Sequence, residues 1–333
     1  MSPHIKGIVL FDDLFWLWRV SRVVCNGQES HARWRWKLID TFRVQKNRLI
    51  FLVKAVLLAD SLKPFIHAEH NTPIRELIEK RPETVGAVVW PYQSNSWDAK
   101  TRLRKIKEHY SIINSSYKKF DFNVDGALIF VRAGDMYENL LVVIDRPKWF
   151  IREGQLVFNL FLANVRIFSL AFSFGLQSGK LVSYVGALQG RDLEGMRETY
   201  KEMTKALYGM RPHDFLFELF RSFCKYIGVS KILAVSEAYR HHRSKYFGNA
   251  EHLAKLNLNY DKTWIERGGI LESPDFYAIN VDPYLKKIED IPSKKRSMYR
   301  HRFKLLQTME ERIHISLDHL GDNSFIVCPF HSL

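Results

Sequence analysis

The sequence has few cysteines, and they lie far apart. Cys25, Cys224 and Cys328 are the three in 333 residues, without a CxxC pair or a Cys/His spacing typical of zinc ligands. This pattern argues against a disulfide framework, and it predicts no metal site. Cys224 falls on the apolar face of a predicted helix, where core packing explains it. Such cysteine usage fits a reducing cytoplasm.

Long apolar runs are also missing. The strongest run, residues 49–58, is broken by Lys54 and followed by Asp60. Because a membrane-crossing helix needs about 20 apolar residues, we interpret this run as a buried helix. Near the N-terminus Asp12 and Asp13 interrupt the apolar stretch and no small-residue cleavage site follows, so no secretory signal is predicted. We expect a cytoplasmic protein, either free or peripheral at the inner membrane.

Acidic residues are outnumbered by basic ones. Lys and Arg total 50 and Asp and Glu total 36, a net charge of +14. This excess favours anionic partners such as nucleic acid, acidic lipid headgroups or phosphorylated cofactors, and it is also common in merely soluble basic proteins. No helix-turn-helix, RNA-recognition or zinc-finger pattern is present, so sequence-specific binding of nucleic acid is not expected. With 46% hydrophobic and 14% aromatic residues, the chain can build a packed core.

Two regions differ in their hydrophobic periodicity. Residues 1–118 are predicted to be mostly helical, and residues 119–333 to form a mixed α/β domain with a basic C-terminal helix. Short connections between successive strand patterns indicate an antiparallel meander, and apolar residues on both strand faces predict covering helices. The expected fold class is α+β, with a mainly antiparallel central sheet flanked by helices. The meander strands are predicted at residues 127–132, 139–144, 155–163, 165–174 and 181–189.

After the meander the pattern changes to helix pair, strand, helix, strand. Glycine ends each helix of the pair, as is common at helix C-termini. The helix pair is predicted to end at Gly209 and Gly228, and it is followed by a buried strand at 231–236, an aromatic-rich helix at 260–266, a strand at 276–281 and the basic helix from Ser293.

This order of elements is similar to that of the GNAT acyltransferases. In that family one strand separates from its neighbour, an acyl carrier group enters the gap, and the carrier's phosphates bind at the N-terminus of the next helix. The resemblance implies a gap between strands 181–189 and 231–236 and a phosphate loop at 189–195. The glycines of that loop have a different spacing here, and Asp192 and Glu194 would repel phosphate. The usual mode of acetyl-CoA binding is therefore not expected, and the donor implied is an acyl carrier, either acyl-carrier protein or a coenzyme A thioester.

Several sequence blocks, in one order, resemble the bacterial VirK/YbjX family from about residue 100 onward. The biochemical activity of that family is not established. The resemblance implies a link to virulence, outer-surface integrity and resistance to cationic peptides. The central block is Gly186-Ala187-Leu188-Gln189-Gly190; the others are at residues 108–110, 152–156, 204–212, 234–236, 260–264 and 294–300.

Four residues are candidates for proton transfer. His241 lies in a polar stretch after a buried strand, where catalytic groups commonly occur, and Asp261 would orient it. An ordinary exposed basic loop also explains His241. Glu153, at the start of a strand, is either a base or the buried ion-pair partner of Arg211. His109, on a basic helix, is either a general base or a packing histidine.

A second set of residues is assigned to the acyl carrier. Arg211 would bind phosphate or carboxylate through a bidentate contact, or form a structural ion pair. Lys294 and Arg296 would bind a phosphorylated carrier or anionic lipid, although a solvated helix face is the commoner reason for such a basic run. Backbone N–H groups would hold a developing oxyanion beside Leu188, Gln189 and Gly190.

Two functions of different classes follow from these residues. The first is a GNAT-like acyltransferase that acts on an envelope-related or protein acceptor at the cytoplasmic membrane face. The second is a non-catalytic adaptor that binds an anionic membrane or a protein partner, suggested by the aromatic and basic residues 34–37 and by the basic C-terminal helix. Binding of nucleic acid through net charge is a third, weaker alternative. Whether the protein is an enzyme stays open at this point.

Overall fold

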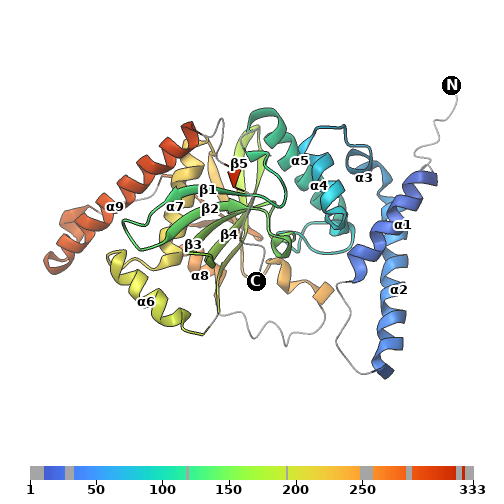
Figure 1. The fold of residues 1–333 in the computed structure, drawn as a ribbon, viewed down its shortest axis with the longest axis horizontal. Coiled ribbons are helices and arrows are strands. Elements are labelled where there is room, and N and C mark those ends of the chain that lie inside the picture. Colours follow the sequence, from blue (N-terminus) through green and yellow to red (C-terminus); the bar gives the residue numbers. More distant parts are fainter. Residues whose placement is uncertain are drawn as a thin grey trace. The chain divides into compact units, whose positions relative to one another are not determined.

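The computed structural model describes residues 11–26, 34–117, 120–192, 194–247, 258–282, 287–319 and 325–326. Cys328 and the side chains of residues 34–37 lie outside the part described. The chain divides into two compact units, both drawn in Figure 1. The N-terminal unit comprises the chain up to Tyr92 together with Trp97–Lys118, and the second unit comprises Gln93–Ser96 together with Lys119–Leu333.

The N-terminal unit is helical, as its sequence pattern predicted. Two of its helices begin at side-chain caps, because the first N–H groups of a helix have no partner within it. The Thr72 hydroxyl accepts the N–H of Arg75, and the Asp98 carboxylate accepts the N–H of Thr101 at 2.7 Å. The elements are α1 (Phe11–Asn26), α2 (Trp34–Leu57), α3 (Ala59–Ile66), α4 (Pro73–Lys80), the 3₁₀ helix η1 (Pro82–Val88) and α5 (Ala99–Ser116).

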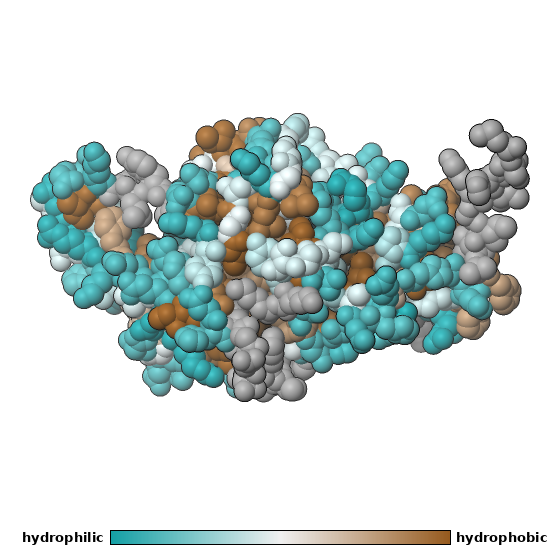
Figure 2. Space-filling model, turned by 90° about the horizontal axis from the view of Figure 1, so that it is seen from above, coloured by the Kyte–Doolittle hydropathy of each residue, from teal (hydrophilic) through white to brown (hydrophobic). Residues whose placement is uncertain are grey.

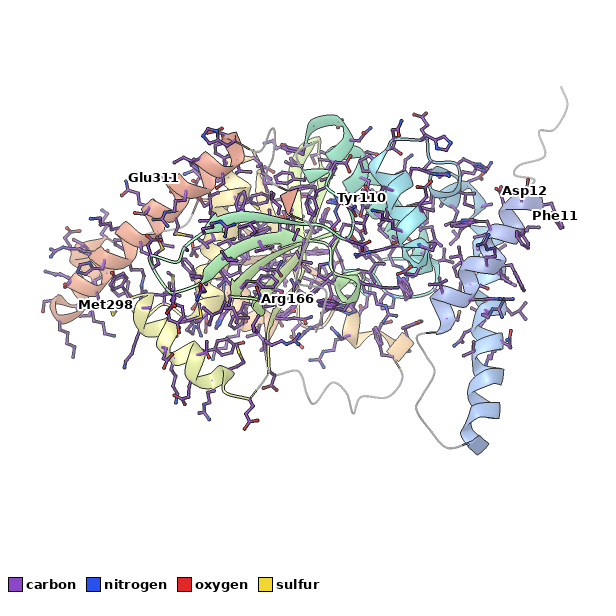
Figure 3. The ribbon with its side chains drawn as sticks, viewed as in Figure 1. Phe11, Asp12, Tyr110, Arg166, Met298 and Glu311 are labelled. Atoms are coloured by element: carbon purple, nitrogen blue, oxygen red, sulfur yellow. The ribbon has the colours of Figure 1, made fainter. Side chains whose placement is uncertain are left out.

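Helices α1 and α2 carry apolar side chains on two opposite sides. Phe51 and Ala55 of α2 are fully buried, whereas the other side of the helix is exposed. The interpretation of residues 49–58 as a buried helix is therefore wrong for half of the segment, because apolar residues continue around the helix past the packed side. Phe11, at the start of α1, points outward in the same manner (Figure 3). The exposed apolar residues are Phe11, Leu14, Phe15, Trp18 and Val23 of α1 and Leu49, Ile50, Val53, Val56 and Leu57 of α2.

Among the described residues, no helix is long and apolar enough to span a membrane. The surface seen in Figure 2 is mainly hydrophilic, with smaller apolar areas between the polar side chains. This distribution agrees with a chain that has 26% charged residues.

The second unit is built on one mixed sheet. The described strands follow the order β7-β8-β6-β5-β4-β3-β2-β1-β9, and all neighbouring pairs are antiparallel except β5 and β6, which are parallel. The strands are β1 (Ala127–Arg132), β2 (Leu140–Asp145), β3 (Leu156–Leu162), β4 (Val165–Gln177), β5 (Lys180–Gly190), β6 (Lys231–Val235), β7 (Ile270–Ser273), β8 (Phe276–Ile279) and β9 (Phe325–Ile326).

The antiparallel meander β1 to β5 is confirmed, and its strand limits lie close to the predicted ones. The sequence analysis missed β7 and β9. Ile270 and Leu271 of β7 are exposed, since β7 is an edge strand. Strand signals from the sequence depend on a buried face, so an exposed edge strand gives a weak one.

One face of the sheet packs on α7 through aromatic rings. The Phe220 ring of α7 lies 4.8 Å from Phe172 of β4 and 5.7 Å from Phe158 of β3, centroid to centroid. Cys224 is buried in the same helix, as core packing predicted. Aromatic contacts of this kind anchor α7 along the sheet. The helices of this unit are α6 (Met196–Ala206), α7 (Pro212–Tyr226), α8 (Tyr260–Ile265) and α9 (Ser293–Asp318).

A second apolar cluster joins the sheet to the turn that precedes β3. Phe150 of that turn packs with Val157, Ala171 and Ala187, which come from β3, β4 and β5. The turn ends in a hydrogen bond from the Gln155 N–H to the Phe172 carbonyl oxygen, at 3.0 Å. This packing holds the turn residues, Glu153 among them, against the sheet.

Candidate functional site

Strands β5 and β6 pair over only part of their length. Their parallel pairing runs from Val182 to Val185 of β5. Beyond that point β5 continues along β4 to Gly190, whereas β6 ends at Val235. The last residues of β5 therefore have an edge that β6 does not cover.

Gly186 lies where the two strands separate. Val185 pairs with Phe172 of β4 and Ala187 pairs with Ala171, which leaves Gly186 as the extra residue of a β-bulge. A Cβ atom on Gly186 would lie 2.0 Å from the carbonyl oxygen of Glu153. The glycine of the central sequence block is thus required for close approach of the Glu153 backbone.

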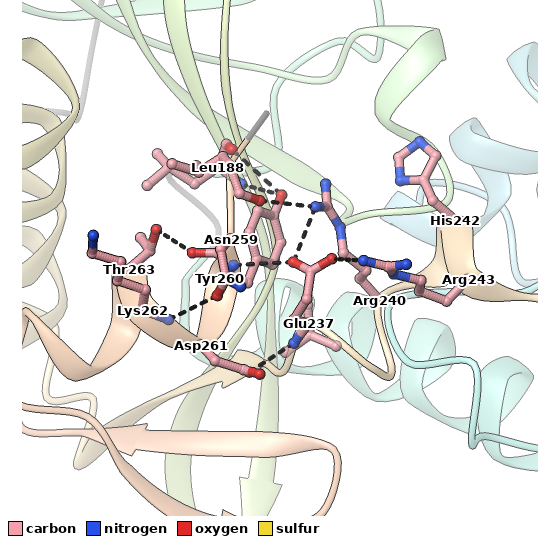
Figure 4. A network of polar contacts seen from close by, with 12 residues as sticks. Leu188, Glu237, Arg240, His242, Arg243, Asn259, Tyr260, Asp261, Lys262 and Thr263 are labelled. Carbon is pink, nitrogen blue, oxygen red and sulfur yellow. Dashed lines mark hydrogen bonds and ion pairs between the residues drawn. The ribbon is translucent and has the colours of Figure 1, made fainter. Parts of the chain in front are cut away.

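The free edge of β5 is capped by Tyr260, the first residue of α8. The Leu188 N–H donates to the Tyr260 hydroxyl oxygen at 2.9 Å, and this hydroxyl donates to the Leu188 carbonyl oxygen at 3.3 Å (Figure 4). Burial raises the pKa of Tyr260 to about 12. A single protonated hydroxyl therefore satisfies both backbone groups that a neighbouring strand would otherwise pair.

Helix α8 also contacts the end of β6. The Trp264 indole N–H donates to the Val235 carbonyl oxygen at 2.8 Å, and the Trp264 ring packs 5.4 Å from that of Tyr260. Both rings are fully buried. One short helix thus fills the space between the diverging strands, with a hydroxyl on one side and an indole on the other.

Glu153 lies beside the free end of β5. The Gln189 amide Nε2 donates to Glu153 Oε1 at 2.6 Å, and the Glu153 residue is only 3% exposed. Burial raises the pKa of Glu153 from 4.5 to about 8, against the opposing effects of the Gln189 hydrogen bond and of Arg240 and Arg152. The carboxyl group can therefore take up and release a proton near neutral pH.

Two adjacent histidines face this carboxyl group. Glu153 Oε1 lies 3.7 Å from His241 Nε2 and 4.0 Å from His242 Nε2. Both distances exceed hydrogen-bonding length. Burial holds the pKa of His241 well below its usual value, and His242, Arg152 and Arg240 lower it further. His241 is therefore an uncharged imidazole next to a carboxyl group. Within the described part of the chain, Glu153, His241 and His242 form a group whose ligand atoms are close enough together to hold a metal ion.

The loop that carries the histidines is fixed by Glu237. Its carboxylate accepts the N–H of Tyr260 at 3.0 Å and ion pairs with Arg240 and Arg243 (Figure 4). The Arg240 guanidinium in turn stacks 3.8 Å from the centre of the Tyr260 ring. The loop and α8 therefore form one polar unit, and a cation lies against the tyrosine.

Asp261 belongs to this scaffold rather than to His241. Its carboxylate Oδ1 accepts the Glu237 N–H at 2.9 Å. The expected partnership between Asp261 and His241 is not formed, and Glu153 takes the place beside His241. The sequence could not show which of the two carboxylates, Asp261 or Glu153, lies beside His241, because both are far from His241 along the chain.

The other predicted residues lie elsewhere. Arg211 pairs with Asp214 at 2.6 Å and with Glu266 at 2.8 Å, so the expected buried pair with Glu153 is replaced by a partly exposed network. Arg296 donates to the backbone carbonyl oxygens of Ile291 and Glu289 at 2.9 and 3.0 Å, and Lys294 is exposed. These bonds give Arg211 and Arg296 structural partners.

His109 belongs to the N-terminal unit and is fully buried. Its ring lies edge-on to Tyr110, with 5.0 Å between the ring centres. This environment matches the packing alternative for His109 rather than a solvent-accessible base. The structure thus brings together only part of the predicted set, namely Glu153, His241 and the strand end from Leu188 to Gly190.

Three contributors to the site were not foreseen. Gln93 donates through Nε2 to the carbonyl oxygens of Tyr184 at 3.1 Å and Glu153 at 3.3 Å, which ties the turn to β5. His242 completes the group around Glu153, and Tyr260 caps β5. The doubled histidine was a visible signal for His242, whereas the role of Gln93 depends on contacts distant in sequence.

A separate cavity of about 750 Å³ lies between the start of α7, the end of α8 and α9. Arg211 is at its rim together with Glu266, and Phe303 of α9 contributes an apolar wall. The cavity is large enough for a small-molecule ligand. Its lining does not include Glu153, His241 or Tyr260.

Sequence comparisons find relatives that agree with the resemblance of the sequence blocks to the VirK/YbjX family. The chain is 23% identical over 270 residues to the uncharacterized protein YbjX of Escherichia coli, a match that covers 79% of this chain and 81% of that protein. Two uncharacterized proteins of Haemophilus influenzae are 31% identical over 129 residues and 30% identical over 151 residues. These two matches cover 39% and 44% of this chain, and 41% and 47% of the relatives. No solved structure matches the chain significantly.

The family model described as "Protein of unknown function (DUF535)" matches residues 40–314. This range includes the bulge glycine Gly186, the buried Glu153, the two histidines and Tyr260. Since the match extends over most of the chain, the protein is a member of the DUF535 family, and it has the Escherichia coli protein YbjX among its relatives.

Proposed function

We propose that this protein transfers an acyl group from a thioester-linked carrier to an amine or hydroxyl acceptor, at the free end of β5. The observation that carries the proposal is the separation of β5 from β6 after Val185, where the Leu188 N–H is bonded to the side-chain hydroxyl of Tyr260 and not to a neighbouring strand. A backbone N–H in such a position can bind a carbonyl oxygen on which negative charge develops.

The arrangement of the strands supports this assignment. A parallel pair, β5 and β6, is joined by the helices α6 and α7, and β8 lies antiparallel on the other side of β6. This is the order for which the sequence resembles the GNAT acyltransferases, in which an acyl carrier enters between diverging strands. Fold likeness alone does not establish an activity, so the proposal depends on the groups at the strand end.

The chemistry assigns one task to each group. The thioester carbonyl oxygen takes the place of the Tyr260 hydroxyl on the Leu188 N–H. Near and above its raised pKa of about 8, Glu153 is ionised and takes the proton of the acceptor, which attacks the carbonyl carbon. The carbon–sulfur bond then breaks, the thiolate takes a proton from the Tyr260 hydroxyl, and the proton held by Glu153 returns to the tyrosine through solvent. The raised pKa of Tyr260 keeps that proton in place at neutral pH.

Tyr260→Phe tests this assignment. The variant keeps the ring but removes the proton donor, and we expect release of free thiol from the donor to fall by roughly 10²–10³-fold. The measurement is thiol release from palmitoyl-coenzyme A and from palmitoyl-acyl-carrier protein, with donor binding followed separately by calorimetry. These two donors distinguish the free from the protein-bound form of the carrier.

Tyr208→Phe is the matched control, because Tyr208 is 38% exposed and lies outside the site. It should leave thiol release unchanged. If neither donor binds the wild-type protein, or if both tyrosine variants release thiol at the wild-type rate, the acyl-transfer proposal is wrong.

As a second candidate function, we propose that the N-terminal unit attaches to anionic membrane surfaces. The observation that favours it is the outward apolar side of α1 and α2, where Phe15 and Trp18 are 54% and 41% exposed. Exposed cations accompany this side on both helices. Helices with aromatic and aliphatic side chains beside Lys and Arg bind at the lipid interface. The exposed cations are Arg19, Arg22, Lys46 and Lys54.

Sedimentation with lipid vesicles measures this binding. The wild-type protein should pellet with vesicles of phosphatidylglycerol and phosphatidylethanolamine, and less so at high salt, because charge attraction is screened. A variant with Phe15→Ser and Trp18→Ser should stay in solution. Trp149→Ser is the control, since Trp149 is 56% exposed but lies in the other unit. Equal sedimentation of all three proteins would contradict membrane attachment through α1.

A further inference from the structure

Three potential metal-ligand atoms converge at the end of β5. They are Oε1 of Glu153 and the Nε2 atoms of His241 and His242, and all lie within 4.8 Å of one another. The rings of the two histidines are 3.8 Å apart, centre to centre. Their Nε2 atoms both face the same oxygen, Oε1 of Glu153. The histidines come from the loop after β6, and Glu153 comes from the turn before β3.

A hydrogen bond between Glu153 and His241 does not account for this arrangement. The 3.7 Å separation of Glu153 Oε1 from His241 Nε2 is too long for a hydrogen bond. The two side chains are nevertheless buried together, each with 5% of its surface exposed.

We propose that Glu153, His241 and His242 bind one divalent transition-metal ion. Imidazole and carboxylate donors suit Zn²⁺ and the chemically similar Co²⁺, Ni²⁺ and Fe²⁺ ions. Metal–ligand bonds of about 2.0–2.2 Å to imidazole nitrogen and carboxylate oxygen place such donors roughly 3–3.5 Å apart. The observed 3.7 and 4.0 Å need only small side-chain movements to reach that spacing.

The surroundings supply a supporting contact. Gln189 Nε2 donates to Glu153 Oε1 at 2.6 Å and fixes the orientation of the carboxyl group. Contacts of this kind hold metal-binding side chains in place. Three protein ligands leave at least one coordination position for water or another ligand, which is typical of reactive rather than purely structural sites.

Two cations near the site determine which further ligand the ion would take. Arg152 and Arg240 both act electrostatically on Glu153. Arg240 is paired with Glu237, which offsets part of its charge. The remaining positive charge disfavours a bare cation and favours an anionic ligand at the open position, such as hydroxide or a carboxylate.

The ion and a proton would compete for the same atoms of Glu153. On the proposed transfer function, a bound ion would therefore prevent Glu153 from accepting the acceptor's proton and would inhibit the reaction. Metal binding itself needs no acyl donor. Failure of the metal-binding proposal can thus be distinguished from failure of the acyl-transfer proposal. Metal binding is measured with the metal alone, and acyl transfer is measured with the thioester donor.

The test is a Zn²⁺ titration of the untagged full chain after chelator treatment, followed by calorimetry, with Co²⁺ absorption as a second readout. We expect one ion per chain, with the visible bands of a nitrogen- and oxygen-ligated Co²⁺ ion. His242→Ala should weaken binding by roughly 100-fold or more, and Glu153→Gln should weaken it as well. His242 is the first choice because its side chain is 28% exposed, against 5% for His241.

His213→Ala is the control, since this histidine lies in α7, outside the group. It should bind Zn²⁺ as the wild-type protein does. Near-ultraviolet circular dichroism reports whether each variant is folded. The proposal is overturned if the wild-type chain binds no stoichiometric ion, or if folded His242→Ala and Glu153→Gln variants bind it with unchanged affinity.

Discussion

Glu153→Gln should unfold at a higher urea concentration than the wild-type protein at pH 8, although it removes a residue of the site. In the folded protein the pKa of Glu153 is raised from 4.5 to about 8. One pKa unit corresponds to about 1.4 kcal/mol, so keeping this group buried costs a few kcal/mol once the unfolded chain has ionised. Glutamine has nearly the same shape, can accept the Gln189 hydrogen bond and never ionises.

The sign of the pH dependence follows from proton binding. Between the unfolded pKa of 4.5 and the folded value of about 8, the folded state holds a proton that the unfolded state has released. The free energy of unfolding contributed by Glu153 therefore falls as pH rises through this window and levels off above it. Glu153→Gln lacks this loss, so the difference between the two proteins should be small near pH 4.5 and largest at pH 8.

Urea unfolding at both pH values, in the presence of a chelator, measures the effect. Glu311→Gln is the matched control, because Glu311 is exposed on α9 and should change stability little at either pH. A Glu153→Gln protein that is less stable than the wild-type protein at pH 8 would contradict the assigned state of the carboxyl group. A buried acid retained at a cost in stability is a common mark of functional sites.

Gly186→Ala should strongly destabilise the protein, by about 3 kcal/mol or more. The added methyl group would lie 2.0 Å from the carbonyl oxygen of Glu153, and backbone atoms cannot move aside as a flexible side chain would. The same displacement would disturb Gln93, which bonds to that carbonyl oxygen. Thermal and urea unfolding measure the loss.

Gly134→Ala is the control for Gly186→Ala. The nearest atom to a Cβ on Gly134 is 3.8 Å away, which is ordinary contact, so that variant should keep wild-type stability within about 1 kcal/mol. A stable Gly186→Ala protein with unchanged Zn²⁺ binding would show that Glu153 is not held against the bulge as described.

Much of the second unit could be predicted because its strands are buried and joined by short turns. The five meander strands and the order of the elements after them were recognisable from apolar runs and from Gly209 and Gly228. The exposed β7 gave no such signal. The outward side of α2 was misjudged for a related reason: an apolar residue that faces solvent looks the same in sequence as one that faces the core.

The candidate site was predictable only in part. Leu188 and Glu153 could be singled out from the sequence blocks that contain them, and His241 from its place after a buried strand. Which carboxylate faces His241 depends on how the turn before β3 and the loop after β6 approach each other. Such contacts come from tertiary packing, which neither periodicity nor spacing encodes, and Asp261 was for that reason given the wrong partner.

Mapping the binding position of an acyl donor tests the central claim most directly. The probe is a photoreactive acyl-pantetheine thioester, cross-linked to the full wild-type chain with and without excess palmitoyl-coenzyme A, and located by peptide mass spectrometry. We expect labelling of residues 184–190 and 258–266, reduced by the competitor, because the diverging end of β5 and the start of α8 enclose the proposed thioester position. Competitor-sensitive labelling confined to the cavity beside Phe303, or no such labelling, would contradict the account.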